Sequence, residues 1–406
     1  MKLDTLIVGL KEVVSPIRKG PVRGNEMGQL KVRKGTNIGI KNGKIAYIGT
    51  ERPPALREVQ AHGLVALPGF VDCHTHIPFI GNRSFEFLMR LEGRSYMEIM
   101  ENGGGIFSTV KAVREASEAE LFRYNMKSLV EMAHYGITTV EGKSGYGLDK
   151  ESELKQLSVL KRLNASQPID VASTFLGAHA FPDGYHKKSE YLEYLLGFVD
   201  KVKKYTNTAD IFCEKGVFEP EESRRFLKEL KRRGFRIRLH ADELAASGGG
   251  KLAVELGAVS ADHLIAADDE TLRAIASSDV TAVLMPGTSF FLREKYARGD
   301  FLISHNGIVA LGSDFNPGSC NIYDPLLVIH LAVSRNGLKV EEAITAYTAN
   351  SAHVLDVADR KGLLEIGYDA DLVLLDLESY LDLPYMFSRE AFAATIKEGK
   401  VIAGDL

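Results

Sequence analysis

The chain has 406 residues, of which 45% are hydrophobic and 26% are charged, and this composition argues against a globally disordered protein. Its formal net charge of -4 and the lack of a basic stripe argue against a nucleic-acid-binding protein. No apolar run approaches the roughly 18 residues of a membrane span, no signal peptide is visible, and three scattered cysteines do not suggest a disulfide framework. We therefore expect a cytoplasmic protein whose partners include neither nucleic acid nor membrane.

The two ends of the chain read as short β-strands. Residues 5–10 are apolar and β-prone, and residues 37–48 alternate around Asn42-Gly43, a two-residue hairpin signal. Residues 370–375 form a buried-strand run, and residues 392–402 predict a second hairpin that turns near Glu398-Gly399. Neither end has enough strands for a core of its own. We predict one composite β-sandwich domain built from residues 1–66 and 361–406.

The middle of the chain alternates apolar strand-like runs with amphipathic helices. Eight strand candidates are present, at 64–71, 137–142, 169–176, 210–214, 235–240, 259–263, 280–285 and 308–312. Helices are predicted between several of them, for example over 118–134, 221–233 and 268–277. Repeated strand–helix units imply parallel strands with right-handed crossovers, and eight units favour a closed barrel. The predicted fold class is therefore α/β, with a (β/α)8 TIM-like barrel over residues 67–360.

Three other features of the middle segment bear on this prediction. A doubly wound open sheet is the alternative fold, but no G-x-G-x-x-G follows an early strand. The glycine runs 103–105 and 248–250 lack the residues of a phosphate loop, so we interpret them as turns, the first also as shaping a loop over the site. We interpret the densest basic cluster as a solvated helix face; it comprises Lys228, Lys231, Arg232, Arg233, Arg236 and Arg238.

Polar residues gather at the ends of the predicted strands, where a barrel places its active site. Residues two apart on a strand face the same side, so His74 and His76 after the first strand can reach one metal ion together. Further potential ligands and acid–base groups follow the fifth, sixth and eighth strands: His240, Asp242, Glu243, Asp262, His263 and Asp314. Neutral imidazoles and a carboxylate suit Zn²⁺ and also Fe²⁺. Together these strand ends predict a metal site.

The stretch PGFVDCHTH at residues 68–76 resembles the opening motif of the amidohydrolase superfamily. Within it, the sequence resembles the imidazolonepropionase family over nearly the whole chain. The matching stretches are FIGNR at 79–83, GGGI at 103–106, KSGYGL at 143–148, FLGAH at 175–179, HADE at 240–243, SADHL at 260–264 and DFNPG at 314–318. The KSGYGL and DFNPG stretches are the most specific. The resemblance implies a metal-dependent hydrolase with a barrel and a split β-sandwich.

The resemblance also implies roles for individual residues. It assigns metal ligation to His74, His76, His240 and Asp314. It assigns substrate binding to Arg83, Tyr96, Tyr146, His179, Glu243, Asn316, Gly318 and Ser319. It assigns catalysis to Glu243, His263 and Asp314. One small departure from the family pattern is Ser313, where threonine is expected.

The implied substrate is a small molecule, 4-imidazolone-5-propanoate, opened by water to N-formimidoyl-L-glutamate in histidine degradation. The resemblance implies one divalent metal per subunit, Zn²⁺ or Fe²⁺/Fe³⁺, and a homodimer. Arg83 suits the propionate, because a guanidinium grips a carboxylate with two hydrogen bonds. We expect His263 to help activate the water and Glu243 to address the ring nitrogen. Glu214 with Lys215 leaves a second metal open, although one metal is favoured.

Two other functions compete with this hypothesis. An aminohydrolase (deaminase) of the same superfamily would use the same metal on a purine or pyrimidine, and ammonia release would favour it. A carboxylate grip by Arg83 and Tyr146 argues against such a neutral base. A non-enzymatic relative with this barrel would be expected to lose ligands, whereas every expected ligand position is filled here.

Overall fold

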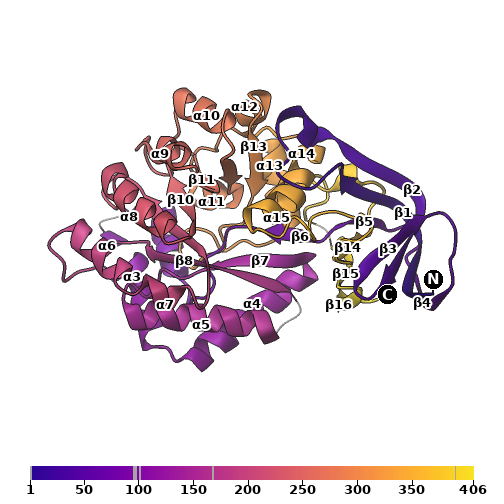
Figure 1. Ribbon diagram of the computed structural model, residues 1–406, viewed down its shortest axis with the longest axis horizontal. Helices are drawn as coiled ribbons and strands as arrows, with labels where there is room; N and C mark the ends of the chain where they lie inside the picture. The colour runs from indigo at the N-terminus through magenta and orange to yellow at the C-terminus, as the bar shows by residue number, and fades with distance from the viewer. Residues whose placement is uncertain (1, 95–97, 100–101, 167–168, 389) are drawn as a thin grey trace.

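The computed structural model of the protein describes residues 2–94, 98–99, 102–166, 169–388 and 390–406. Its strands form two separate sheets, one from the two ends of the chain and one from the middle. Figure 1 shows the terminal sheet, which carries both chain ends, to the right of the helix-covered central sheet. No helix within the described residues combines the length and the apolar character that crossing a membrane requires.

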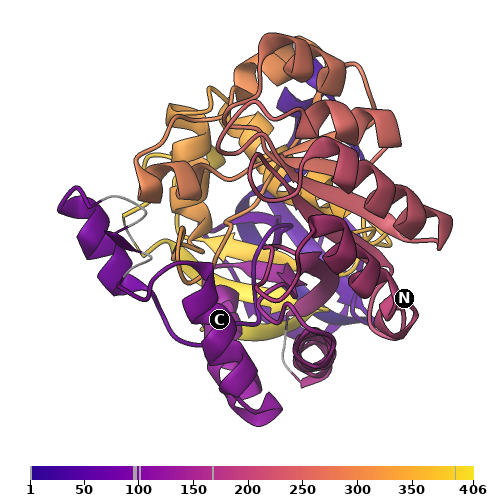
Figure 2. The same cartoon turned by 90° about the vertical axis from the view of Figure 1, so that its left-hand side faces the viewer.

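The central sheet is parallel, and its strands are neighbours in chain order. They are β6 (Phe70–Asp72), β7 (Ile137–Lys143), β8 (Asp170–Ala178), β9 (Thr208–Cys213), β10 (Arg236–Ala241), β11 (Ser260–His263), β12 (Thr281–Leu284) and β13 (Ile308–Leu311). A parallel bridge between Thr75 and Phe315 joins the segments that follow the first and last strands. Helices ring the strands in chain order (Figure 2). The predicted α/β fold class with an eight-stranded barrel is confirmed.

Helices fill the connections around this sheet. They are α1 (Ser84–Leu91), α3 (Ile106–Glu115), α4 (Glu118–His134), α5 (Lys150–Ser166), α6 (Lys188–Leu196), α7 (Val199–Val202), α8 (Pro220–Arg232), α9 (Gly249–Leu256), α10 (Asp269–Ala276), α11 (Pro286–Leu292), α12 (Gly299–Ser304), α13 (Pro325–Ser334), α14 (Val340–Thr345) and α15 (Ser351–Val354), with short helical turns η1 (Gly24–Gly28), η2 (Ala346–Asn350) and η3 (Tyr380–Asp382). The prediction for 118–134 is confirmed as α4. Ser117 and Glu120 form a reciprocal capping box at its start, and buried Leu121 and Leu129 lie on its inner face.

The terminal sheet takes strands from both ends of the chain. They are β1 (Leu3–Pro16), β2 (Leu30–Lys41), β3 (Lys44–Gly49), β4 (Ala55–Gln60), β5 (Val65–Pro68), β14 (Leu372–Leu375), β15 (Phe392–Lys397) and β16 (Lys400–Gly404). Both predicted hairpins are present. Asn42-Gly43 and Glu398-Gly399 have positive φ at both residues, which is the conformation that tight hairpin turns require. Buried side chains from the two ends, such as Ile7 and Leu374, share one apolar cluster.

The predicted first barrel strand, 64–71, is wrong as a single element. Its first part, β5, pairs with β1 and β14 in the terminal sheet, whereas β6 pairs with β7 in the barrel. Gly69 joins the two parts. A Cβ at Gly69 would lie 2.3 Å from Cγ2 of Thr138, so glycine allows the chain to pass between the sheets. The domain boundaries at 66/67 and 360/361 stay a prediction.

Candidate active site

The closure of the barrel brings two of the predicted ligand segments together. The N–H of Asp314 donates to the carbonyl oxygen of His74 (2.9 Å), and the N–H of His76 donates to the carbonyl oxygen of Phe315 (2.9 Å). Asp314 holds a left-handed backbone with φ of 56°, an uncommon conformation for a residue other than glycine. Such strained residues cluster at functional sites, because the surrounding fold must hold them in place. The seam of the barrel therefore positions the carboxylate beside the two imidazoles.

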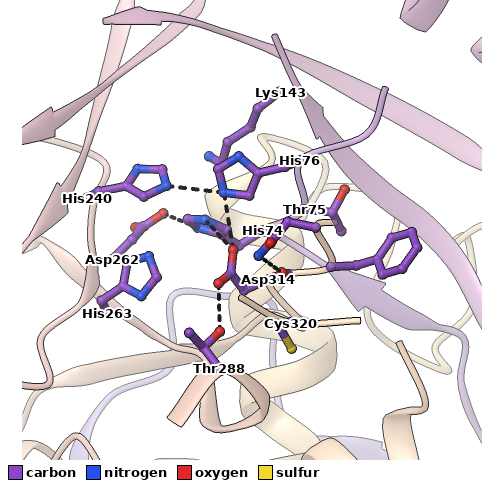
Figure 3. Close-up of polar contacts among 12 residues, drawn as sticks. His74, Thr75, His76, Lys143, His240, Asp262, His263, Thr288, Asp314 and Cys320 are labelled. Carbon is purple, nitrogen blue, oxygen red and sulfur yellow. Dashed lines mark hydrogen bonds and ion pairs between the residues drawn. The ribbon is translucent and has the colours of Figure 1, made fainter. Parts of the chain in front are cut away.

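Four buried side chains converge at this seam, and they are the four predicted metal ligands. Asp314 Oδ1 lies 3.2 Å from Nε2 of His76 and 3.6 Å from Nε2 of His74. Nε2 of His240 lies 3.4 Å from Nε2 of His76. Figure 3 shows these side chains pointing toward one another from different strand ends. His263 reaches the same place, because its ligand atom lies within 4.8 Å of those of His74 and Asp314.

These residues fit a divalent metal ion. Nε2 of His74 and Oδ1 of Asp314 are buried and have no hydrogen-bond partner among the described residues, an arrangement that costs free energy unless a ligand satisfies them. Burial holds the pKa of His74 and of His76 well below the usual value, so their rings are neutral. Neutral imidazole nitrogens with a carboxylate oxygen are the donor set that zinc and iron accept.

Carboxylates on the far side of two imidazoles orient them. Asp262 Oδ2 lies 2.6 Å from Nδ1 of His74, and Asp210 Oδ2 lies 3.0 Å from Nδ1 of His240. Each contact places the ring proton on Nδ1 and turns Nε2 toward the centre of the site. Burial alone would lower the pKa of His240, but the Asp210 carboxylate outweighs it and the pKa is raised.

Two buried cations hold these carboxylates. Lys143 Nζ lies 2.8 Å from Asp210 and 2.9 Å from Glu141. Arg238 donates to Asp262 (2.6 Å) and to Glu141 (2.5 Å). Three carboxylates and two cations leave one negative charge in excess beneath the candidate metal ligands, which favours a bound cation.

The interpretation of the basic cluster as a solvated face is wrong for Arg238. This side chain is fully buried on β10 and points into the barrel, two residues before His240. Its closeness in sequence to the exposed cations of α8 led to that grouping. Side chains on a strand point alternately to opposite faces, so Arg238 lies on the same face as His240, two residues later. That alternation was the signal that could have found it.

A cavity of about 150 Å³ opens from the metal-ligand cluster. Its lining includes most of the predicted substrate and acid–base residues: Arg83, Tyr146, His179, Glu243, His263, Asn316 and Ser319. Ile106 also lines it, as expected for a loop over the site, and Phe212 was not predicted. Gly318 lies against Arg83, since a Cβ at Gly318 would fall 2.3 Å from Nη1. Tyr96 lies outside the described residues.

Glu243 and His263 both line this cavity and lie close together, with Oε2 of Glu243 3.5 Å from Nε2 of His263. Burial, reinforced by the charge of Asp314, raises the pKa of Glu243 to about 8, whereas burial lowers the pKa of His263 to about 3. Glu214 accepts hydrogen bonds from the backbone N–H groups of Glu243 (2.9 Å) and Leu244 (3.0 Å). Its carboxylate therefore positions the Glu243 loop. Glu214 belongs to neither of the two groups of described residues that could hold a metal ion.

Several residues of this site were not assigned by sequence reasoning. Glu141, Asp210 and Arg238 lie inside apolar strands, and a charged residue in a buried strand is a signal because it must be paired. Thr288 donates to Oδ2 of Asp314 (2.6 Å), as Figure 3 shows. No sequence signal pointed to Thr288, which lies in the first turn of α11, far from the other site residues in the chain.

Comparisons with known proteins match this chain over most of its length. The model of the amidohydrolase family matches residues 88–403. A curated imidazolonepropionase from Kosmotoga olearia is 63% identical over 402 residues, covering 99% of each chain, and one from Bacteroides thetaiotaomicron is 44% identical over 409 residues, covering 98% of each.

Solved structures share the fold at low sequence identity. A triazine hydrolase variant superposes with a TM-score of 0.76 at 16% identity, covering 98% of this chain and 94% of the other. A zinc complex of an atrazine chlorohydrolase from Arthrobacter aurescens gives 0.72 at 16% identity, covering 98% and 95%. The barrel with a terminal sheet is therefore a fold that other hydrolases share.

Proposed function

Because the chain belongs to the amidohydrolase family and, within it, to the imidazolonepropionases, we propose that it opens the ring of 4-imidazolone-5-propanoate with water to give N-formimidoyl-L-glutamate. It is a metal-dependent hydrolase of histidine degradation, as the sequence predicted. One observation links the proposed activity to a site in this structure. Three imidazoles and a carboxylate converge in a cavity that also contains the guanidinium of Arg83. A metal ion held by these ligands would suit the ring amide, and the guanidinium suits the propionate.

The reaction joins the oxygen of water to the ring carbonyl carbon and breaks the bond from that carbon to the ring nitrogen. One proton leaves the water, and one reaches the departing nitrogen. A divalent metal held by His74, His76, His240 and Asp314 would lower the pKa of a water to roughly 7 and polarise the carbonyl oxygen. We propose a single ion, zinc or iron, because both accept this donor set.

The chain's own groups move the protons and hold the substrate. Oδ1 of Asp314 is buried and unpaired among the described residues, so it is placed to receive a proton from the water. Glu243 has a pKa raised to about 8, so it keeps a proton at neutral pH and can give it to the ring nitrogen. His263, opposite Glu243, orients the water. This division of roles develops the expectation from the sequence.

The opposite part of the cavity holds the acid tail. Arg83 supplies a permanent positive charge for the propionate. Burial raises the pKa of Tyr146 far above the working range, so its phenol stays protonated and can donate to the same carboxylate. His179 stacks on His76, with ring centroids 4.9 Å apart, and limits the space beside the candidate metal ligands. Asn316 and Ser319 are joined by a hydrogen bond (2.8 Å) and complete this wall.

The direct test is the disappearance of imidazolone propionate, followed by ultraviolet absorption with purified protein of measured metal content. We expect turnover that stops on chelation and returns with Zn²⁺ or Fe²⁺. Metal-loaded protein that leaves the imidazolone unchanged would refute the proposal, and release of ammonia from a purine or pyrimidine would support the aminohydrolase alternative instead. The single metal, the cytoplasmic location and the homodimer stay proposals that metal analysis, fractionation and sedimentation would test.

A further inference from the structure

Glu86, which was not among the predicted site residues, makes a bidentate contact with Arg83. Its Oε1 accepts from Nε of Arg83 (2.6 Å), and its Oε2 accepts from Nη2 (2.7 Å). The Glu86 side chain is 1% exposed and the Arg83 side chain is 12% exposed. A buried carboxylate on a fork-shaped guanidinium fixes both the position and the plane of the cation. Glu86 therefore determines where the guanidinium points.

The contact uses one edge of the guanidinium and leaves another free. A guanidinium has five N–H donors, and Nε with Nη2 form one parallel pair. Nη1 of Arg83 donates no hydrogen bond to any of the residues that the structure describes. Nη1 and the second N–H of Nη2 form another pair of parallel N–H donors, which matches the two oxygens of a carboxylate. Arg83 lines the candidate active-site cavity and also the larger cavity beside it, and this edge is the one that the contact with Glu86 leaves available to a propionate.

Glycines on both sides confine the pair. The guanidinium lies on Gly318, where a Cβ would be 2.4 Å from Cζ of Arg83. Gly105 donates its N–H to Oε1 of Glu86 (2.8 Å) and has φ of 83° and ψ of −179°, a combination that is essentially restricted to glycine. Gly104 passes so close that a Cβ would lie 3.0 Å from Oε1 of Glu86.

Through Gly105, the same carboxylate holds the segment that enters the cavity. Ile106 follows Gly105 directly, begins α3 and lines the site. Figure 1 shows α3 at the end of the barrel away from the terminal sheet. One buried group thus fixes both the cation and the adjacent wall. This accounts for the Gly103–Ile106 stretch, which the proposed reaction does not itself require.

We propose that Glu86 is a positioning residue for substrate recognition: it aims the free edge of Arg83 at the acid tail and anchors the Gly105–Ile106 wall. The inference rests on the proposed function, since it needs a substrate with a carboxylate. It makes Glu86 responsible for the preference for an acid tail over a neutral one, although Glu86 does not touch the substrate.

The test compares imidazolone propionate with the same ring carrying a propionamide. Glu86→Ala should raise KM for the acid about tenfold or more and change kcat less than about threefold. Its preference for the acid over the amide should fall by a similar factor. Glu86→Gln should raise KM less than Glu86→Ala does. Its amide oxygen can still accept from Nε of Arg83, although its NH₂ then faces Nη2 and cannot accept from it. Glu92→Ala, at an exposed side chain beyond the end of the same helix, is the matched control and should behave as wild type.

Glu86→Ala in an Arg83→Ala background should add little further loss, because Glu86 acts through Arg83. Circular dichroism and Tm establish that each variant is folded, and Glu86→Gln serves if Glu86→Ala is not. An unchanged acid preference overturns the inference, and so does a lower KM, which would mean that the charge of Glu86 opposes binding. Failure of the wild type to open the acid at all refutes the proposed function, and the inference with it.

Discussion

Asp262→Asn tests whether the buried carboxylates beneath the site set its affinity for metal. Oδ2 of Asp262 accepts from both His74 and Arg238, at 2.6 Å each. Asparagine has the same shape, and its amide oxygen in the place of Oδ2 can still face both donors, but a neutral amide oxygen accepts more weakly than a carboxylate oxygen. The substitution also removes the one negative charge that the five-residue cluster has in excess. Loss of such an outer partner costs about 10- to 100-fold in metal affinity, or roughly 1.4–2.7 kcal/mol.

The assay is competition for Zn²⁺ against a chromophoric chelator, which reports Kd without relying on turnover. Arg238 keeps Glu141 as a partner (2.5 Å), so the fold should survive, and thermal unfolding would verify this. Asp200→Asn is the control, because that side chain is 78% exposed and 3.8 Å from Arg233. A Kd within about twofold of wild type in a folded Asp262→Asn protein would refute the argument that this carboxylate tunes the site.

Three further predictions address the substrate grip and the fold. Arg83→Ala should raise KM for the imidazolone acid with little change in Tm, and steady-state kinetics with an unaltered KM would contradict the carboxylate grip. Lys361 and Lys397 outweigh burial and lower the pKa of Asp170. Its contribution to stability is therefore present above its unfolded pKa of about 3.9 and lost as pH falls through the folded pKa. Asp170→Asn should cost about 1–2 kcal/mol in urea unfolding at pH 7 and much less near pH 3; an equal cost at both would contradict this. Leu374→Ala, in the core of the terminal sheet, should cost about 2–5 kcal/mol in the same assay, and a negligible loss would contradict the shared core.

The sequence was most informative where periodicity and turn chemistry act locally. Asn42-Gly43 specified a hairpin, because few residues tolerate positive φ. The ends of parallel strands all lie at one rim, so residues such as His240 and Asp314 could be brought together without a structure. The predicted metal ligands converge for this reason.

What the sequence could not supply depends on contacts between distant segments. The run at 64–71 is continuous in hydrophobicity, and only pairing with β14 shows that it serves two sheets. Arg238 looked like a surface cation, because its partners Glu141 and Asp262 come from other strands. The role proposed for Glu86 could not be predicted, since its pairs with Arg83 and Arg90 have ordinary helix spacing and its contact with the N–H of Gly105 comes from another loop.

The pairing of β5 with β14 also constrains how the chain matures during synthesis. Leu67 in β5 is opposite Val373 in β14, so the ribosome has made nearly the entire barrel before β5 gains this neighbour. Until then β5 has one unpaired edge, which is a hazard for aggregation. Gly69 connects β5 directly to β6, the strand that leads to His74, so the last strands of the chain pair with the segment that enters the barrel. The edge of β5 is therefore completed only near the end of translation.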